Sequence, residues 1–128
     1  MANYPSMLDQ YHNGYAELAK EIPKTTASFG RLVMDATTDG ALSTKVKELM
    51  ALSIAITMRC DGCMAHHAQA VAQAGATRQD VAEAIGVAIA MGGGPSTIYG
   101  VAALRAYDRF TESKTQMAYS GIPPTDPH

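Results

Sequence analysis

The sequence predicts an all-α protein, a single domain built as a bundle of about six helices. Apolar residues recur at steps of three and four along most of the chain, which is the period of an amphipathic helix. Alanine, methionine, leucine and isoleucine supply most of the apolar content, and these residues favour helices. The sequence contains no alternating run of β-branched residues that would indicate a strand. The length of 128 residues is typical of one domain.

Two amphipathic helices are predicted at the N-terminus. The first covers residues 4–22, with Pro5 allowed in its opening turn and Pro23 ending it. Its apolar stripe consists of Tyr4, Leu8, Tyr11, Tyr15, Leu18 and Ile22. A second, shorter helix is predicted over residues 26–36. Its expected buried face consists of Phe29, Leu32, Val33 and Ala36.

A central helix is predicted over residues 46–58, after a start that the side chain of Ser43 can cap. After Glu48 this segment is apolar on nearly every side, and a helix without a polar face must be enclosed by other helices. Asp61 and Gly62 then interrupt the pattern, and a fourth helix follows until Gly75 ends it.

Two further helices complete the predicted bundle. Thr77 to Asp80 has the spacing of a capping box and opens the fifth helix. The inner face of that helix is expected to consist of Val81, Ala84, Ile85, Ala88 and Ile89. The run Gly92 to Pro95 breaks the pattern, and Pro95 suits the first turn of a last helix that reaches about Phe110.

Domain organisation and broad class follow from composition. The helical domain is predicted to span residues 1–112, with its motif core at 40–92, and the proline-containing residues 113–128 to form an extended tail. The net charge of −2 and the lack of a basic stripe argue against nucleic-acid binding. The chain has neither a signal-peptide pattern nor the ~18 consecutive apolar residues of a membrane helix, so we expect a cytoplasmic protein that does not bind membranes.

A cysteine pair is the expected centre of any chemistry. Cys60 and Cys63 are three residues apart and His67 lies four beyond Cys63, so on a helix all three project from one face. If the helix starts near Asp61, both sulfurs lie in its first turn, where unpaired backbone N–H groups and the helix dipole favour a thiolate. A second thiol within reach can attack an oxidised first thiol and close a disulfide.

Two acid–base residues accompany the cysteines. His67 can exchange protons near physiological pH. Glu48 is a carboxylate in the first turn of the enclosed central helix, where it needs a partner. Such a pair close to a thiol is what general-base activation of a nucleophile requires, so we predict that Glu48 and His67 form a proton relay.

Zinc binding is the alternative use of these residues. The cysteine pair and one adjacent histidine, His66 or His67, supply three ligands, whereas a structural zinc ion takes four. The other histidines are distant in sequence, and we therefore expect no metal and no other cofactor. His66 itself is interpreted as a surface or packing residue, and His12 as a solvent-facing or interfacial one.

The order of these residues resembles a known signature. Glu48, eleven residues, Cys60-Asp-Gly-Cys63, three residues and His67 are similar to the motif of the AhpD-like alkylhydroperoxidases within the carboxymuconolactone decarboxylase family. The flanking segments 40–49 and 75–84 resemble that family too, so the similarity extends from about residue 23 to residue 105. CxxC alone is a weak signal, whereas all three elements at these intervals in a helical context are specific.

The resemblance implies an activity and a role for each residue. It implies a thiol-dependent alkylhydroperoxide reductase, or disulfide reductase, in which Cys63 attacks the peroxide and Cys60 resolves the product as a disulfide. Glu48 and His67 would deprotonate Cys63. Helix-dipole reasoning alone leaves the nucleophile open, because Cys60 is nearer the helix start. Gly62 stands where the better-known members carry a histidine, which implies a shorter relay and weaker peroxidase activity.

The resemblance also implies partners. These are a hydroperoxide or another small molecule as substrate, a dithiol protein that reduces the disulfide, and further copies of this chain in a trimer or hexamer. Two other functions remain open. A lactone decarboxylase of the kind that gives the wider family its name needs no cysteine pair, whereas a non-catalytic redox-sensing module would oxidise its thiols but turn over slowly.

Overall fold

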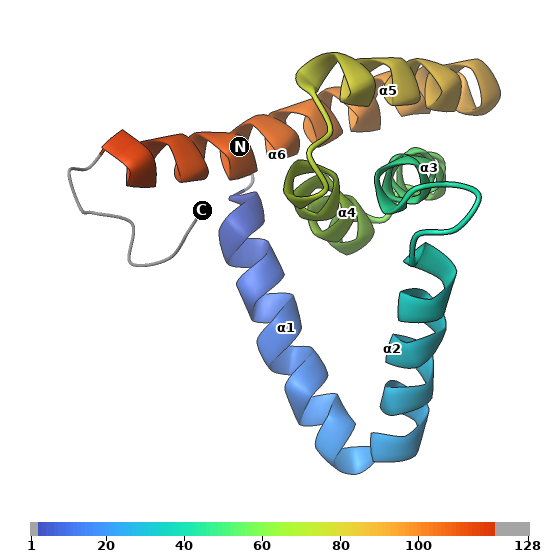
Figure 1. The fold of residues 1–128 in the computed structure, drawn as a ribbon, viewed down its shortest axis with the longest axis vertical. Coiled ribbons are helices and arrows are strands. Elements are labelled where there is room, and N and C mark those ends of the chain that lie inside the picture. The colour runs from blue at the N-terminus through green and yellow to red at the C-terminus, as the bar shows by residue number, and fades with distance from the viewer. Residues whose placement is uncertain (1–2, 120–128) are drawn as a thin grey trace.

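The structure, a computed structural model, describes residues 3–119, with side chains up to residue 112. This part of the chain contains six α-helices (Figure 1). This arrangement confirms the predicted all-α fold class. The helices are α1 (Tyr4–Glu21), α2 (Pro23–Thr37), α3 (Thr44–Met58), α4 (Asp61–Gln73), α5 (Arg78–Gly92) and α6 (Gly94–Tyr119).

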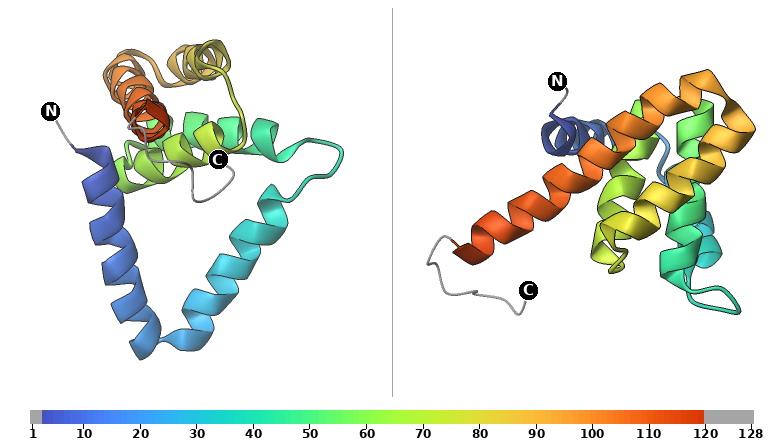
Figure 2. Two further views of the ribbon diagram at one scale, coloured as in Figure 1. Left: turned by 60° about the vertical axis from the view of Figure 1, so that its left-hand side comes forward. Right: turned by 90° about the horizontal axis from the view of Figure 1, so that it is seen from above.

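The helices divide into a body and a hairpin. In the body, α5 packs on α3 and α6, and α4 packs on the same two helices. The hairpin of α1 and α2 extends from the body as an open V, as Figure 1 and the left view of Figure 2 show. The arm α1 contacts α4 and α6, and the arm α2 contacts α3. Both arms meet the body at the ends that lie away from the turn between them (Figure 1).

Capping residues and glycines in the sequence predicted several helix ends correctly. The side chain of Ser43 accepts a hydrogen bond from the Val46 N–H at 3.2 Å and caps α3. Thr77 and Asp80 form the predicted capping box of α5, with reciprocal bonds of 3.0 and 2.9 Å. Gly75, with a φ of 84°, takes the left-handed conformation that terminates α4.

The boundary between the first two helices differs from the prediction. Only Ile22 separates α1 from α2, and Pro23 is the first residue of α2 and not merely a stop for α1. Proline is favourable there because the first helical residue needs no N–H donor. The tyrosine hydroxyl of Tyr15 donates to the carbonyl oxygen of Thr26 at 3.1 Å and links the two arms of the hairpin.

The last helix is longer than predicted. The expected end near Phe110 is wrong, because α6 continues to Tyr119 and so includes part of the segment predicted as an extended tail. Neither proline nor glycine occurs between Thr111 and Tyr119 to stop the helix. Residues 120–128 of the predicted tail lie outside the described residues. None of the helices in the described part is long and apolar enough to cross a membrane.

The core lies within the body and takes in the start of α1. The predicted inner face of α5 is confirmed for Val81, Ile85 and Ala88, all of which are buried. The buried hydroxyl of Tyr107 donates to the Ala76 carbonyl oxygen at 2.7 Å, so both polar groups are satisfied. The largest fully buried apolar side chains are Leu8, Leu52, Ile56, Met64, Val71 and Val81.

Several apolar faces that were predicted to be buried are exposed. Phe29 and Leu32 of α2 are 54% and 63% exposed, because the hairpin has no helix beyond it to cover them. The central helix α3 is only partly enclosed, since its other face presents apolar side chains to the outside. The exposed large apolar residues of α3, α5 and α6 are Val46, Met50, Ile54, Met58, Val87, Met91, Ile98 and Val101.

Candidate active site

A residue in the left-handed conformation at the end of α3 determines where the cysteine pair lies. Arg59, with a φ of 57°, ends α3 in the conformation usually taken by glycine, at a cost of roughly 1–2 kcal/mol. The N–H of Cys60 then bonds to the carbonyl oxygen of Ala55 at 3.2 Å, and the chain turns directly into α4. The prediction that Asp61 and Gly62 interrupt the helical pattern is wrong, because both belong to the first turn of α4.

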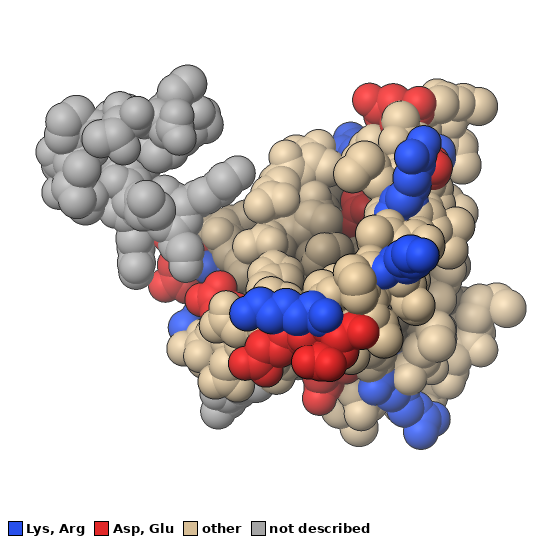
Figure 3. All heavy atoms as spheres, turned by 90° about the horizontal axis from the view of Figure 1, so that it is seen from below, with Lys and Arg blue, Asp and Glu red and all other residues tan. Residues whose placement is uncertain are grey.

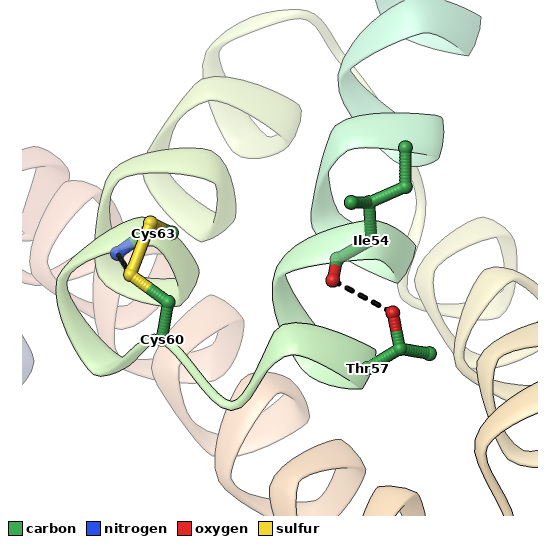
Figure 4. Close-up of a disulfide and its surroundings, with 4 residues drawn as sticks. All are labelled: Ile54, Thr57, Cys60 and Cys63. Carbon is green, nitrogen blue, oxygen red and sulfur yellow. Dashed lines mark hydrogen bonds between the residues drawn. A yellow bond between two sulfur atoms is a disulfide. The ribbon is translucent and has the colours of Figure 1, made fainter.

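Cys60 and Cys63 are joined by a disulfide at the start of α4, with their Cα atoms 5.2 Å apart (Figure 4). The helix begins at Asp61, which is the start for which the sequence predicts both sulfurs at the N-terminus of the helix. Cys60 is its N-cap, and the Cys60 sulfur accepts a hydrogen bond from the Cys63 N–H at 3.2 Å. Cys63 is the more exposed of the two. Both sulfurs therefore lie where backbone N–H donors favour negative charge. Reduction of the disulfide to the dithiol takes two electrons.

A buried carboxylate lies behind the pair. Glu48, only 6% exposed, approaches His67 with Oε2 2.8 Å from Nδ1, which joins the second turn of α3 to the second turn of α4. An ionised carboxylate can only accept a hydrogen bond, so Nδ1 carries the proton and Nε2 keeps a lone pair. The structure thus brings together the two residues that the sequence singled out, and leaves His67 with one nitrogen free to accept a proton.

A cavity of about 390 Å³ opens beside the disulfide, between α1, α2 and α4. The disulfide and His67 form part of one wall, while α1 and α2 supply mainly aromatic and aliphatic side chains. None of the lining residues is lysine or arginine. The lining residues are Tyr11, His12, Tyr15, Phe29, Gly30, Val33, Cys60, Gly62, Cys63, His66 and His67. The cavity therefore suits a small, largely apolar and uncharged molecule in contact with sulfur.

His66 lines this cavity. The sequence did not predict this position, because His66 was interpreted as a surface or packing residue. Its ring stands edge-on to that of His67, with centroids 4.9 Å apart, and lies 6.4 Å from the ring of His12 on α1. Burial lowers the pKa of His66, and the neighbouring imidazoles of His67 and His12 lower it further, against a smaller opposing effect of Glu48. His66 is therefore neutral near pH 7.

The hairpin residues of the cavity were also missed. Tyr11, Tyr15, Phe29 and Val33 were expected to pack in a core, because their helical spacing shows an apolar face but not what that face contacts. The concentration of aromatic residues on the first two helices is the one signal in the sequence that points to a binding wall. In the part of the chain that the structure describes, no three His, Cys, Asp or Glu side chains are grouped so that they could hold a metal ion.

Charge on the hairpin side is mixed. Figure 3, which views the molecule from the end of the hairpin, shows lysine, arginine, aspartate and glutamate side chains interspersed around a hollowed area that carries few of them. The visible face has no extended area of positive charge. Diffusing ligands are therefore not selected on this face by a strong field of one sign.

Comparisons with known proteins identify the family. Residues 23–106 match the sequence model of the carboxymuconolactone decarboxylase family. An uncharacterised protein of Cupriavidus necator is 34% identical over 101 residues, which cover 79% of this chain and 89% of the relative. A protein from the cox locus of Paracoccus denitrificans is 34% identical over 70 residues, 55% of this chain and 63% of the relative.

Two solved structures are similar as well. The apo form of lpg0406, a carboxymuconolactone decarboxylase family protein from Legionella pneumophila, is 37% identical and superposes with a TM-score of 0.83 over 84% of this chain and 96% of that one. TM1620 from Thermotoga maritima is 25% identical, with a TM-score of 0.66 over 80% of this chain and 97% of that one. With the family match covering more than half of its length, this chain belongs to the carboxymuconolactone decarboxylase family.

Proposed function

We propose that this protein is a thiol-dependent hydroperoxide reductase of the AhpD-like type, which passes through the Cys60–Cys63 disulfide. The observation that carries the proposal is that the Cys60–Cys63 disulfide lines one cavity together with His67, which is paired with the buried Glu48. The nucleophile is Cys63, the resolving thiol is Cys60, and His67 held by Glu48 is the base.

The proposed cycle begins with the dithiol. Cys63 gives its proton to Nε2 of His67, and its thiolate attacks the terminal oxygen of the hydroperoxide. The S–O bond forms, the O–O bond breaks, and the alkoxide leaves with the electron pair and takes the proton back from His67 as an alcohol. Cys60 then attacks the sulfenic sulfur, the S–O bond breaks, and hydroxide leaves as water with the proton of Cys60.

A dithiol partner protein closes the cycle by exchanging with the disulfide, which restores both thiols and oxidises the partner. We assign the cycle to the cytoplasm, because thiol reductants keep dithiols reduced there. The lining of the cavity supports a hydroperoxide over the anionic acid that a lactone decarboxylase binds, since no lysine or arginine of this chain lines it to pair with a carboxylate.

The reduced protein is expected to lose both thiols when a small excess of cumene or tert-butyl hydroperoxide is added. Intact mass should fall by two hydrogen atoms, and with excess dithiothreitol the protein should form many equivalents of alcohol per chain. A redox-sensing module would instead stop after about one equivalent. Loss of no thiol within minutes would contradict the proposal, with a Cys60→Ser, Cys63→Ser double variant as the control for uncatalysed oxidation.

We further propose that the protein is a homo-oligomer, trimeric or hexameric. Large apolar side chains are exposed on three helices that pack on one another, and Met91 of α5 and Ile98 of α6 are 81% and 72% exposed. Surfaces of this kind on a small domain indicate an interface. Sedimentation velocity at micromolar concentration should give a trimer or hexamer for wild type, and a smaller species for Met91→Glu. A monomeric wild type would contradict this.

A further inference from the structure

One polar atom at the cavity is buried and has no hydrogen-bond partner. This atom is Nδ1 of His66, and it is the only such side-chain nitrogen or oxygen among the residues that the structure describes. The other ring nitrogen, Nε2, is not among the buried atoms without a partner, and His66 is part of the cavity wall. A buried polar atom without a hydrogen-bond partner needs an explanation.

The burial of Nδ1 determines which nitrogen of His66 carries the proton. A neutral imidazole has one N–H donor and one lone pair. An unpaired buried N–H group is rarer in proteins than an unpaired acceptor, so the lone pair belongs on Nδ1 and the proton on Nε2. His66 thus differs from His67, in which Glu48 holds the proton on Nδ1. This assignment gives the two imidazoles that α4 contributes to the cavity lining opposite tautomers, with the lone pair of His67 and the proton of His66 on Nε2.

The position of His66 suits a ligand that reacts with Cys63. The two residues are three apart on α4, so they are neighbours on the helix surface, and both line the cavity. The opposite walls are mainly aromatic and aliphatic, so they leave a donor at His66 few competing protein groups. Because burial keeps the ring neutral, the donor adds no positive charge that would have to be removed from water.

We propose that His66 donates a hydrogen bond from Nε2 to the oxygen that leaves when the hydroperoxide O–O bond breaks. This inference rests on the proposed peroxidase function and adds a catalytic residue to it. Negative charge develops on the alkoxide oxygen as the S–O bond to Cys63 forms, and a fixed donor stabilises it. The proton that completes the alcohol comes from His67, which received it from Cys63. His66 keeps its own proton throughout the cycle, so no further reactant is needed.

The test uses substitutions that distinguish the roles of the two ring nitrogens of His66. Glutamine places its amide nitrogen near the position of Nε2 and keeps the donor, asparagine reaches only the position of Nδ1, and phenylalanine keeps the ring shape without a donor. The measurement is the rate constant for oxidation of the reduced protein by tert-butyl hydroperoxide in stopped flow. We expect about a 100-fold loss for His66→Phe and His66→Asn, and a loss of less than about fivefold for His66→Gln.

Two further readouts distinguish this role from a structural one. With peracetic acid the leaving group is a carboxylate, which is far less basic than an alkoxide, so the loss for His66→Phe should shrink to less than about tenfold. Reaction of the Cys63 thiol with an aromatic disulfide reagent involves no oxygen leaving group and should be unchanged in all three variants. Circular dichroism and the oligomeric state serve as controls for folding.

The outcomes are separable. Equal rates for wild type and His66→Phe with tert-butyl hydroperoxide would overturn the role of His66 and leave the peroxidase proposal intact. A loss of the same size with the peracid and the disulfide reagent would also overturn it, because it would reveal a disturbed site. A wild type that is inert to hydroperoxides would overturn the function itself, and this inference with it.

Discussion

Substitution of Cys63 by serine is expected to lower the rate of hydroperoxide reduction by at least about a thousandfold, because a hydroxyl at this position is far less nucleophilic than a thiolate. The side chain is exposed and the change removes no core contact, so the fold should persist. The measurement is alcohol formation from cumene hydroperoxide under excess dithiothreitol, with circular dichroism on the same sample.

The matched variant is Cys60→Ser. It should retain the first reaction with peroxide at close to the wild-type rate, accumulate a sulfenic acid on Cys63 that dimedone traps, and fail to turn over through a disulfide. If the roles are reversed, the trapped sulfenic acid will lie on Cys60 in the Cys63→Ser variant. Turnover of a lactone acid by Cys63→Ser at an undiminished rate would instead favour the decarboxylase alternative and rule out a required thiol.

Glu48→Gln is expected to lower the same rate by about 100-fold near pH 7, in the range that general-base catalysis contributes. Glutamine keeps the size of the side chain and can still accept a hydrogen bond from His67 through its amide oxygen, so the buried contact at 2.8 Å survives without its charge. The imidazolium that forms when Cys63 loses its proton is then no longer stabilised by a carboxylate.

The pH profile identifies the cause. In Glu48→Gln the rate should rise with pH toward the ordinary thiol pKa of about 8.5, because hydroxide then removes the proton that the relay normally accepts. Glu17→Gln is the control, since Glu17 is an exposed glutamate on the outer part of α1. A Glu48→Gln rate that matches wild type across the whole pH range would show that the carboxylate is only structural.

The sequence by itself was sufficient for the fold class and for those parts of the site that lie on one helix. Helix ends such as the Thr77–Asp80 box depend on hydrogen bonds between residues three apart, so local sequence predicts them. The same applies to Cys60, Cys63 and His67, which the period of α4 places on one face. Glu48 lies on another helix, and its pairing with His67 was predicted from chemistry, because an enclosed carboxylate needs a partner and His67 can exchange protons near the cysteines.

The long-range arrangement was less predictable. Periodicity predicts that a face is apolar, but it carries no information on whether a core, a cavity or another subunit covers that face. Phe29 and Tyr11 were therefore expected in a core and instead line the cavity, and Met50 and Ile54 were expected inside the bundle and are exposed. The left-handed turn at Arg59 was likewise missed, because arginine has no local preference for that conformation.

Sequence alone thus determined an all-helical chain with a cysteine pair at the start of a helix, because helical periodicity, capping and CxxC spacing act over a few residues. Only the tertiary structure decided that α1 and α2 stand away from the body and wall a cavity beside the disulfide. It also decided that one nitrogen of His66 is buried without a partner in a residue that lines that cavity. These features depend on contacts between segments far apart in the chain, whose free energies no local pattern encodes.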